Sequence, residues 1–523
     1  MSNGHLLAID VGATVVRAGV YDMDGRCLAV RTRTVDVRHP EPGQTEVHAT
    51  AYYDAAAMVS RRALRAAEMA GKQVEAVGMA CQMGGIVGVD EAHKPVTRFD
   101  PHLDERCQPI REQLMREHES TIRSLTGCLP YLGVKIKWWQ DHQPDDAAKV
   151  RKWVTIGGYL AGRMTGLSAD QAVIDRTNLG VSGLGDNAGG VWSDELLGLY
   201  GISGDVLPRI LRSGDVVGQL VPEVASEFNL PPGVPIVAGL GDYPATFLGA
   251  GLTRPGRLCD LSANICHFAA SAERFAADGR YRALSTLASP SDGLWYAMAY
   301  VNAGGMTCRW FLQDVPNQRA DDEKLALLVR GLEEQAATLA PGADGLLFLP
   351  HLTGRQCPWD PAMRGSWLGL RPSHTQSHLH RSILESVAFE YAYFLQVTRG
   401  LFEQTTFDEI YGIGAGTRSQ LWSQIKADVL GVPYVLPTRD GHALLGAAAV
   451  AAAGVNAIPS LQQAIDRWVR PGVRLEPDRD RHRDYVEIFE VYVKALGDLR
   501  PIFRDLRNVA RRITSPPKEP GQS

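Results

Sequence analysis

Two segments about half a chain apart share one design, and this repetition constrains the fold more than any other feature. Residues 6–25 read LLAIDVGATVVRAGVYDMDG, and residues 235–251 read PIVAGLGDYPATFLGAG. In each, an apolar run typical of a buried strand leads to a carboxylate, Asp10 or Asp242, beside a turn of small residues. Such turns let backbone N–H groups come close to an anion. Two of them facing each other would hold a polyphosphate and its metal ion, so the sequence predicts a site for phosphoryl transfer.

The length of the chain predicts two domains, because 523 residues exceed the size at which a single core stops growing. The contents of 45% hydrophobic and 22% charged residues are typical of an ordinary globular protein. The net charge of -5 gives no general electrostatic reason to bind nucleic acid or an anionic membrane. A small-molecule partner is therefore expected.

Nothing in the sequence predicts export or membrane insertion. The N-terminus enters a strand pattern by about Leu6, without a basic region, a long apolar stretch or a cleavage site. No run of about 18 uninterrupted apolar residues is present. The eight cysteines form no CxxC pair and no Cys/His metal spacing, which predicts buried thiols in a reducing cytoplasm.

The hydrophobic pattern predicts a mixed α/β fold that starts twice, with a domain boundary near residues 251–258. A helix pattern rich in alanine and charge in the first half suits a helix on the surface. The predicted strands cover residues 6–11, 14–21, 76–79, 257–261 and 294–300, and the predicted helices cover residues 51–70, 379–401 and 419–430.

Four blocks of the sequence resemble the motifs of the FGGY family of carbohydrate kinases, in the order that the family has them. AIDVGATVVRAGVYD is similar to the first phosphate motif and GLGDYPATFLGAG to the second. FLPHLTGRQCPWDPAMRGSWLGL resembles the family signature, and YGIGAGTRSQLWSQIKADVLGVPY resembles the adenosine motif. One glycine-rich turn is a weak signal, but four blocks in register from about Leu6 to about Trp468 are a strong one.

The resemblance implies an α/β fold of two related actin-like (ribonuclease H-like) domains with a cleft between them. Residues 1–252 would form the N-terminal domain that binds sugar and phosphate. Residues 253–512 would form the C-terminal domain that binds the nucleotide. Residues 513–523 are polar and rich in proline, which predicts a disordered tail.

The resemblance also implies roles for residues near the phosphates. Asp242 would be the general base that takes the proton of the sugar hydroxyl, or alternatively only the cap of the helix that follows. Asp10 and Asp242 would lie near Mg²⁺, Asp10 through water. Arg17 would contact the transferring phosphate, with a solvated charge on a hairpin strand as the alternative. Gly12 would give the turn its freedom, and Thr14 would bind a phosphate oxygen.

The adenosine of ATP is expected in the second domain. Gly414 and Ala415 precede a helix that begins near Ser419, so a flat adenine could lie against backbone with few side chains. The alternative is a glycine-rich turn that is required only for helix packing. The other residues expected at the nucleotide are Asn264, Gly305, Arg309 and Ser419.

The sugar is expected near Asp242 and three residues that follow a strand. Gln82, Met83 and Gly84 resemble the Gln-Met-His of xylulose kinases, with Gly84 in place of the histidine. Asp104, in HLDER, matches a carboxylate that accepts hydrogen bonds from sugar hydroxyls, and an ion pair with Arg106 is the alternative. Met83 taken alone is better interpreted as a wall or core residue.

Three hydroxyl side chains that the family usually carries near the phosphates are absent. Ala13, Val15 and Ala263 stand at those positions. Each missing hydrogen bond costs about 0.5 to 1.5 kcal/mol, which predicts a weaker ATP site without loss of activity.

The leading hypothesis is a cytoplasmic kinase that uses ATP and Mg²⁺ to phosphorylate a ketopentose such as xylulose. A tetritol, glycerol or a hexulose remains an alternative substrate. A catalytically weak sensor that binds sugar and nucleotide is the second hypothesis, motivated by the missing hydroxyls. A chaperone-like ATPase is disfavoured because no long peptide-binding domain follows the core. A homodimer is a further expectation, since oligomers are common among relatives.

Overall fold

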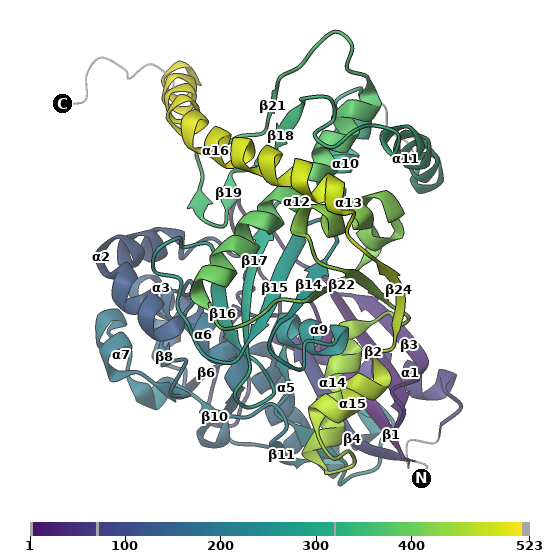
Figure 1. The fold of residues 1–523 in the computed structure, drawn as a ribbon. Coiled ribbons are helices and arrows are strands. Elements are labelled where there is room, and N and C mark those ends of the chain that lie inside the picture. Colours follow the sequence, from purple (N-terminus) through teal and green to yellow (C-terminus); the bar gives the residue numbers. More distant parts are fainter. Residues whose placement is uncertain (1–3, 70–72, 318–320, 515–523) are drawn as a thin grey trace, which may run out of the picture.

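Two seven-stranded sheets form the framework of the chain (Figure 1). The computed structural model describes residues 4–69, 73–317 and 321–514. The first sheet contains β11 (Val216–Gln219), β12 (Pro235–Val237), β4 (Val74–Cys81), β1 (His5–Val11), β2 (Val15–Asp22) and β3 (Cys27–Thr34) in this order, with β13 (Leu240–Gly241) beside β4. The second sheet contains β16 (Ser285–Ala288), β17 (Trp295–Val301), β15 (Cys266–Ala272), β14 (Arg257–Leu261), β22 (Glu409–Ile413), β23 (Tyr434–Pro437) and β24 (Pro471–Leu475).

The two sheets share one topology. In the first, β1, β2 and β3 form an antiparallel meander, β4 pairs parallel with β1, and β12 pairs parallel with β4. In the second, β14, β15 and β17 form the meander, β22 pairs parallel with β14, and β23 with β22. The expectation of an α/β fold with two halves of related design is confirmed.

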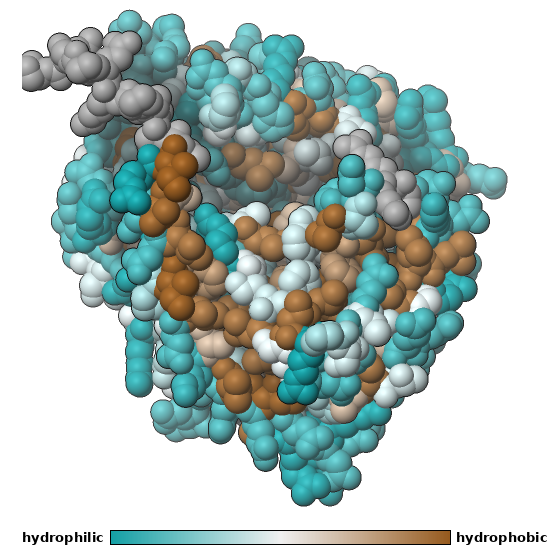
Figure 2. Space-filling view, turned by 90° about the horizontal axis from the view of Figure 1, so that it is seen from above, coloured by the Kyte–Doolittle hydropathy of each residue, from teal (hydrophilic) through white to brown (hydrophobic). Residues whose placement is uncertain are grey.

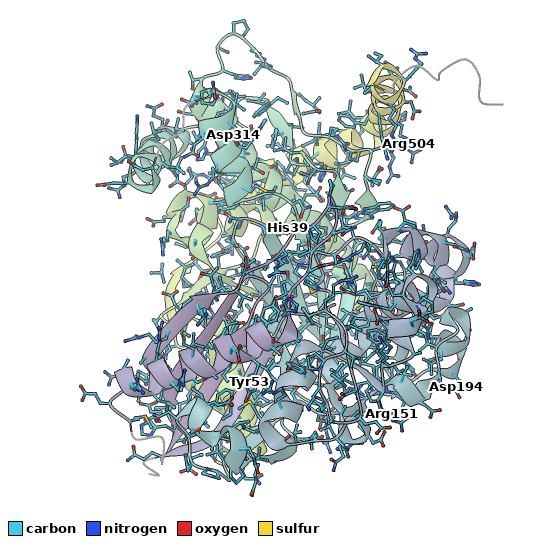
Figure 3. The ribbon with its side chains drawn as sticks, turned by 180° about the vertical axis from the view of Figure 1, so that it is seen from behind. His39, Tyr53, Arg151, Asp194, Asp314 and Arg504 are labelled. Atoms are coloured by element: carbon cyan, nitrogen blue, oxygen red, sulfur yellow. The ribbon has the colours of Figure 1, made fainter. Side chains whose placement is uncertain are left out.

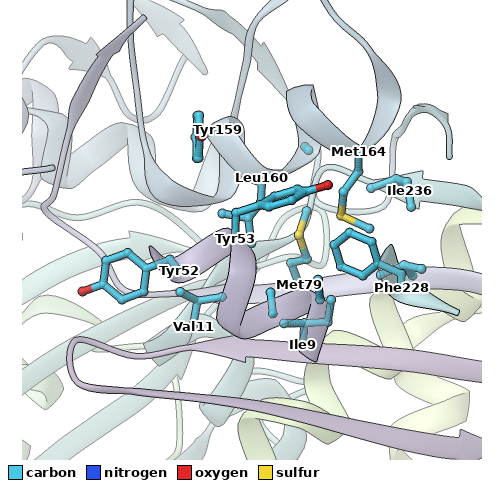
Figure 4. Close-up of a cluster of buried hydrophobic side chains, with 14 of the residues drawn as sticks. Ile9, Val11, Tyr52, Tyr53, Met79, Tyr159, Leu160, Met164, Phe228 and Ile236 are labelled. Atoms are coloured by element: carbon cyan, nitrogen blue, oxygen red, sulfur yellow. The ribbon is translucent and has the colours of Figure 1, made fainter. Parts of the chain in front are cut away.

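Apolar runs in the first sheet are buried because helices cover it. In β1 every residue except His5 is buried. Tyr52, Tyr53 and Val59 of the helix α1 (Ala49–Ala66) belong to the same hydrophobic cluster as Ile9 and Val11 of this strand. Figure 4 shows Tyr53 between the strands and the helix α5 (Ile156–Thr165), and Figure 3 shows it from the back of the molecule. The expected surface helix therefore holds one half of the core by its buried face.

One helix of the later sequence packs on the first sheet. The helix α14 (His442–Gly454) contains few polar residues, and Leu444, Leu445 and a run of alanines join the cluster that contains Leu6 and Ala8 of β1. A helix that is apolar all round is expected to be buried on all sides. It crosses α9 (Asp242–Ala250) so closely that a Cβ on Gly249 would lie 1.9 Å from the carbonyl oxygen of His442. A helix that follows the second half in sequence thus completes the hydrophobic core of the first half.

The remaining long helices cover the second sheet and the flank of the first (Figure 1). Their bounds are α2 (Gln108–Thr126), α3 (Leu132–His142), α11 (Asp322–Ala336), α12 (Gln376–Leu401), α13 (Gln420–Leu430), α15 (Leu461–Trp468) and α16 (Arg479–Thr514). In the part of the chain that the structure describes, no helix combines the length and the hydrophobicity that crossing a membrane requires.

The predicted elements lie within a few residues of the observed ones, and two boundaries need correction. The helix predicted over residues 51–70 ends at Ala66, because the backbone of Glu68 adopts a positive φ of 56°. Of the tail predicted over residues 513–523, residues 513 and 514 are the last of α16, and residues 515–523 lie outside the described residues.

Candidate active site

Asp10 and Arg17 form an ion pair at the end of the first hairpin. The register of β1 and β2 places the two residues opposite each other, and Arg17 Nη1 lies 3.1 Å from Asp10 Oδ2. Burial raises the pKa of Asp10 to about 6, although the charge and hydrogen bond of Arg17 lower it. Half of the Arg17 side chain is exposed, so its guanidinium can also contact a ligand.

Hydrogen bonds within the protein fix the turn between β1 and β2. The N–H of Gly12 donates to the Val15 carbonyl at 3.0 Å, and Gln82 Nε2 donates to the Gly12 carbonyl at 3.3 Å. Gln82 is 1% exposed, and its Oε1 atom has no hydrogen-bond partner within the described residues. Thr14 is exposed at the tip. The turn therefore presents backbone and a hydroxyl to solvent while Gln82 fixes its base.

Asp242 begins α9 at the end of β13. The N-cap position belongs to Gly241, and Asp242 Oδ1 accepts a hydrogen bond of 2.9 Å from the N–H of Tyr243. The interpretation of Asp242 as the N-cap of this helix is therefore wrong. Burial, followed by the charge of Asp10, raises the pKa of Asp242 to about 7. In the sheet, Asp10 lies opposite Ala80 and Gly241 lies opposite Cys81, on the two sides of β4, so Asp10 and Asp242 lie at the same edge.

A third buried carboxylate supports this turn and was not singled out from the sequence. Asp175 ends the short strand β7 (Val173–Asp175) and accepts hydrogen bonds from the Thr177 hydroxyl and, at 2.7 Å, from Asn178 Nδ2. Thr177 Oγ1 in turn accepts from the N–H of Gly241 at 2.8 Å. Burial raises the pKa of Asp175 to about 6. The signal was present, since an apolar strand that ends in Asp is also the pattern around Asp10.

Several residues that the sequence predicts at the nucleotide meet at one turn of the second half. The N–H of Ser262 donates to the Ile413 carbonyl and its own carbonyl accepts from Gly416, both at 2.9 Å, while the Ala263 carbonyl accepts from the N–H of Gly305 at 3.0 Å. Asn264 follows in the same turn, and a Cβ on Gly305 would lie 3.1 Å from its Oδ1. These contacts bring Asn264 and Gly305 to the turn that contains Gly414 and Ala415.

Gly414 is required by its backbone. Its φ is +88°, and a Cβ there would lie 2.5 Å from the Ser262 carbonyl oxygen. Ser419 is the N-cap of α13 and accepts a hydrogen bond of 3.0 Å from the N–H of Trp422. Arg309 is an exposed residue at the end of α10 (Gly305–Arg309). The glycine thus has a packing reason, which leaves its expected contact with adenine a prediction.

A cleft of about 690 Å³ extends from the Asp10–Arg17 ion pair to the turn that contains Gly414. Asp10 and Arg17 of the first half and Gly414 of the second half line it, together with Thr246 of α9 and His442 at the start of α14. An elongated anion such as a nucleoside triphosphate fits a cleft whose walls come from both halves.

The residues expected at the sugar lie apart from this cleft. Met83 is buried, and its Sδ lies 2.5 Å from where a Cβ on Gly241 would be. Gly84 has a φ of +76°, and a Cβ there would lie 3.2 Å from the ring of Tyr131. A side chain at position 84 would therefore begin in tight contact with the ring of Tyr131.

Asp104 is bound by Arg106 of its own segment and by Thr45 of a distant one. Its carboxylate accepts hydrogen bonds from Arg106 Nη2 at 2.6 Å and from the N–H of Thr45 at 2.8 Å. Burial raises the pKa of Asp104, but the Arg106 and Thr45 hydrogen bonds outweigh burial and hold it below its usual range. The alternative of an ion pair with Arg106 is present, and a contact of Asp104 with sugar stays a prediction.

The second half contains a carboxylate at the position that Asp10 has in the first. Asp260 is the penultimate residue of β14, as Asp10 is of β1, but it is fully buried. Its oxygens lie 2.5 Å from Lys426 Nζ and accept from the hydroxyls of Tyr391 at 2.7 Å and Tyr434 at 2.5 Å. Lys426 also donates to Ser262. The Asp260 carboxylate therefore stabilises the turn at Ser262 from inside the protein and, unlike Asp10, does not line the cleft.

Comparison with known proteins gives the family. The N-terminal domain of the FGGY family of carbohydrate kinases matches residues 5–249, and its C-terminal domain matches residues 264–455. A gluconokinase of Bacillus subtilis is 24% identical over 94% of this chain and 95% of its own. A xylulose kinase of Staphylococcus epidermidis is 24% identical over 96% of this chain and 99% of its own. A glycerol kinase of Deinococcus radiodurans is 27% identical over 90% of this chain and 93% of its own.

Solved structures share the fold along almost the whole chain. Gluconate kinase from Lactobacillus acidophilus superposes with a TM-score of 0.88 at 20% identity, covering 96% of this chain and 99% of that one. Xylulose kinase from Rhodospirillum rubrum superposes with a TM-score of 0.87 at 24% identity, covering 96% and 100%. With both family domains matched in order, the chain belongs to the FGGY family of carbohydrate kinases.

Proposed function

We propose that this carbohydrate kinase transfers the γ-phosphoryl group of ATP to a sugar hydroxyl with Asp242 as general base. The bond from the γ-phosphorus to the ADP oxygen breaks as the new ester bond forms, and the hydroxyl proton goes to the Asp242 carboxylate. A pKa of about 7 supports this role, because a base works best near the ambient pH. Arg17, at the mouth of the cleft, would bind the charge of the phosphates.

We propose Mg²⁺ as the metal, held between Asp10, Asp242 and the phosphates. No cluster of three or more His, Cys, Asp or Glu side chains that could hold a metal occurs within residues 4–69, 73–317 and 321–514. Two carboxylates completed by phosphate oxygens and water are the usual donors for Mg²⁺, which neutralises phosphate charge when bound. The raised pKa values of Asp10 and Asp242 support the same site, since a cation would favour both ionised forms.

The substrate class is a short polyhydroxylated chain. A ketopentose such as xylulose is the first candidate, and xylulose kinases are among the relatives. Gluconokinases and glycerol kinases are equally close relatives, so sugar acids and polyols are included. A coupled ADP-release assay across pentuloses, hexuloses, tetritols, pentitols, glycerol and aldonates tests the proposal. Stimulation by one acceptor supports it, while sugar and nucleotide binding without turnover would instead support the sensor.

The pH dependence of sugar phosphorylation should follow the ionisation of Asp242. The pKa of this carboxyl is raised, so it is protonated and inactive as a base below about 7 and ionised above. We therefore expect kcat/KM for the sugar to rise with pH and to level off at or below about 7, since bound Mg²⁺ would favour the ionised form of Asp242. A profile that stays flat from about pH 5 to about pH 8 would contradict the role of Asp242 as the base.

We also propose that two copies of the chain associate through α16. Its last turns extend beyond the body of the molecule, where Arg504 is labelled (Figure 3), and Figure 2 shows hydrophobic surface on that side. The exposed apolar residues there are Ile502, Leu506, Val509 and Ile513, at spacings of four, three and four residues. This is the spacing of a coiled-coil seam.

Charge complementarity supports an antiparallel pair. If Leu506 faces Val509 of the second copy, Asp505 faces Arg512 of that copy, and the reverse pair forms at the other end. Multi-angle light scattering should show a dimer that Leu506→Asp or Asp505→Arg converts to a monomer. Asp505→Arg combined with Arg512→Asp should restore it. Leu327→Asp, at an equally exposed leucine of α11, is the control. A dimer that is lost in Leu327→Asp but retained in Leu506→Asp would contradict the assignment of the interface to α16.

A further inference from the structure

A second cleft between the two halves is rich in arginine. Its volume is about 460 Å³, and its walls come from α2 and Tyr131 on one side and from Tyr300, Gln356 and Trp359 on the other. Four arginines line it against two glutamates; they are Arg111, Arg116, Arg123 and Arg282, with Glu112 and Glu119. The excess of positive charge indicates an anionic ligand.

Arg111 and the exposed Arg116 are the arginines of this cleft that pair with no carboxylate in the described part of the chain, and of the two it is Arg111 that lies over an aromatic ring. Glu119 is already shared by Arg123, at 2.8 Å, and Arg282, at 3.1 Å. Arg111 has no carboxylate within ion-pair distance in the described part of the chain. Its guanidinium donates to Gln108 and lies 5.2 Å from the ring centre of Tyr131. A stacked guanidinium is oriented in advance, which favours two-point binding of a carboxylate.

Aromatic rings connect this cleft with the candidate base. Tyr243 follows Asp242 and shares a hydrogen bond of 2.8 Å with His267 Nε2. The His267 ring stacks on Tyr300 with centroids 5.7 Å apart, and Tyr300 lines the cleft. Burial lowers the pKa of His267 to about 4, so the imidazole is neutral and adds no charge of its own.

The residues expected at the sugar approach the second cleft through Tyr131, which lines it. The ring of Tyr131 lies 3.2 Å from where a Cβ on the expected substrate residue Gly84 would be, and the Arg111 guanidinium lies 5.2 Å from the centre of the same ring. A polyhydroxylated chain with its reacting hydroxyl at Asp242 could therefore reach Arg111 with its far end. A neutral ketose would leave this guanidinium without an anionic partner, whereas an acid would neutralise it.

We propose that Arg111 binds the carboxylate of the acceptor, so that the substrate is a sugar acid of the aldonate class. The inference rests on the proposed phosphoryl transfer and goes further by naming the acceptor chemistry. A phosphate group on the acceptor would satisfy the same arginine, so sugar phosphates form a separate arm of the test.

The experiment compares acceptors that share one carbon skeleton. ADP release is measured with gluconate against glucitol and with xylonate against xylitol and xylulose, and phosphorylated sugars form the third arm. The variants are Arg111→Gln and Arg111→Lys, with Arg65→Gln, at an exposed arginine of α1, as control. For an aldonate we expect Arg111→Gln to raise KM about 10- to 100-fold with kcat nearly unchanged, the loss of one charge-assisted hydrogen-bonded pair.

The outcomes separate this inference from the proposed function. Arg111→Lys should recover part of the affinity for the aldonate, Arg65→Gln should have no effect, and the KM for ATP should stay constant in all variants. Added salt should raise the aldonate KM of the wild type without affecting a neutral acceptor, which tests the ion pair without any substitution. A preference for the neutral member of each pair, or for a sugar phosphate, or an aldonate KM unchanged in Arg111→Gln, would overturn the inference. Absence of turnover with every acceptor would overturn the proposed function itself.

Discussion

Replacing Asp242 by Asn should reduce kcat for sugar phosphorylation by about 10²- to 10⁴-fold, the contribution typical of a general base. The amide is nearly isosteric with the carboxylate but cannot take the hydroxyl proton. Nucleotide affinity should fall much less than kcat, because Arg17 and Gly414 still line the cleft and Asp10 would still be present for Mg²⁺.

The folded state should tolerate this change. A pKa raised to about 7 means that the folded protein holds the proton more tightly than the unfolded chain, so ionised Asp242 lowers the free energy of unfolding as pH rises through 7. Asp242→Asn should thus leave the melting temperature equal or higher. Asp194→Asn is the matched control, since Asp194 also begins a helix, α7 (Asp194–Tyr200), and is not among the residues that line either cleft. Near-normal turnover in a folded Asp242→Asn protein would contradict the role of Asp242 as general base.

Replacing Lys426 by Met should lower the free energy of unfolding by about 3 to 5 kcal/mol, because it removes one partner of a buried ion pair. Lys426 is 1% exposed, and Asp260 would keep only hydroxyl partners for its charge in a fully buried position. Urea unfolding followed by circular dichroism measures the effect. ATP affinity should fall as well, since Lys426 donates to Ser262, which holds the nucleotide turn.

Two further variants make this result specific. Lys137→Met removes an exposed lysine paired with Asp141 at 3.1 Å and should cost less than about 1 kcal/mol. Asp260→Asn combined with Lys426→Met should recover part of the stability, because no unpaired charge then remains buried. If Lys426→Met unfolds at the urea concentration of the Lys137 control, the buried pair does not stabilise the second half.

Local pattern predicted the parts of the site that local geometry forms. Asp10 and Arg17 face each other because a short turn joins two strands, and Ser419 caps α13 within one turn of helix. The position of Asp242 at the end of a short strand follows from the same kind of pattern. The alternative in which Asp242 only caps the helix misses by one position, since Gly241 provides the cap.

The rest of the site depends on contacts between distant segments. Thr177 supports Gly241 across 64 residues, and Tyr131 lies against Gly84 in a way that no periodicity of either segment indicates. The return of α14 to the first sheet is set by close helix crossing at Gly249, which only the folded structure shows. The sequence therefore predicted the arrangement of Asp10 and Arg17 better than the surroundings of the residues expected at the sugar.

The most direct test of phosphoryl transfer by Asp242 is the stoichiometry of product formation. The wild-type protein is incubated with Mg-ATP and the best acceptor, and ADP and phosphorylated acceptor are quantified together by mass spectrometry. We expect one phosphorylated acceptor for each ADP, and formation of both to fall together in Asp242→Asn. ADP formed without phosphorylated acceptor, or unchanged product in Asp242→Asn, would contradict the account.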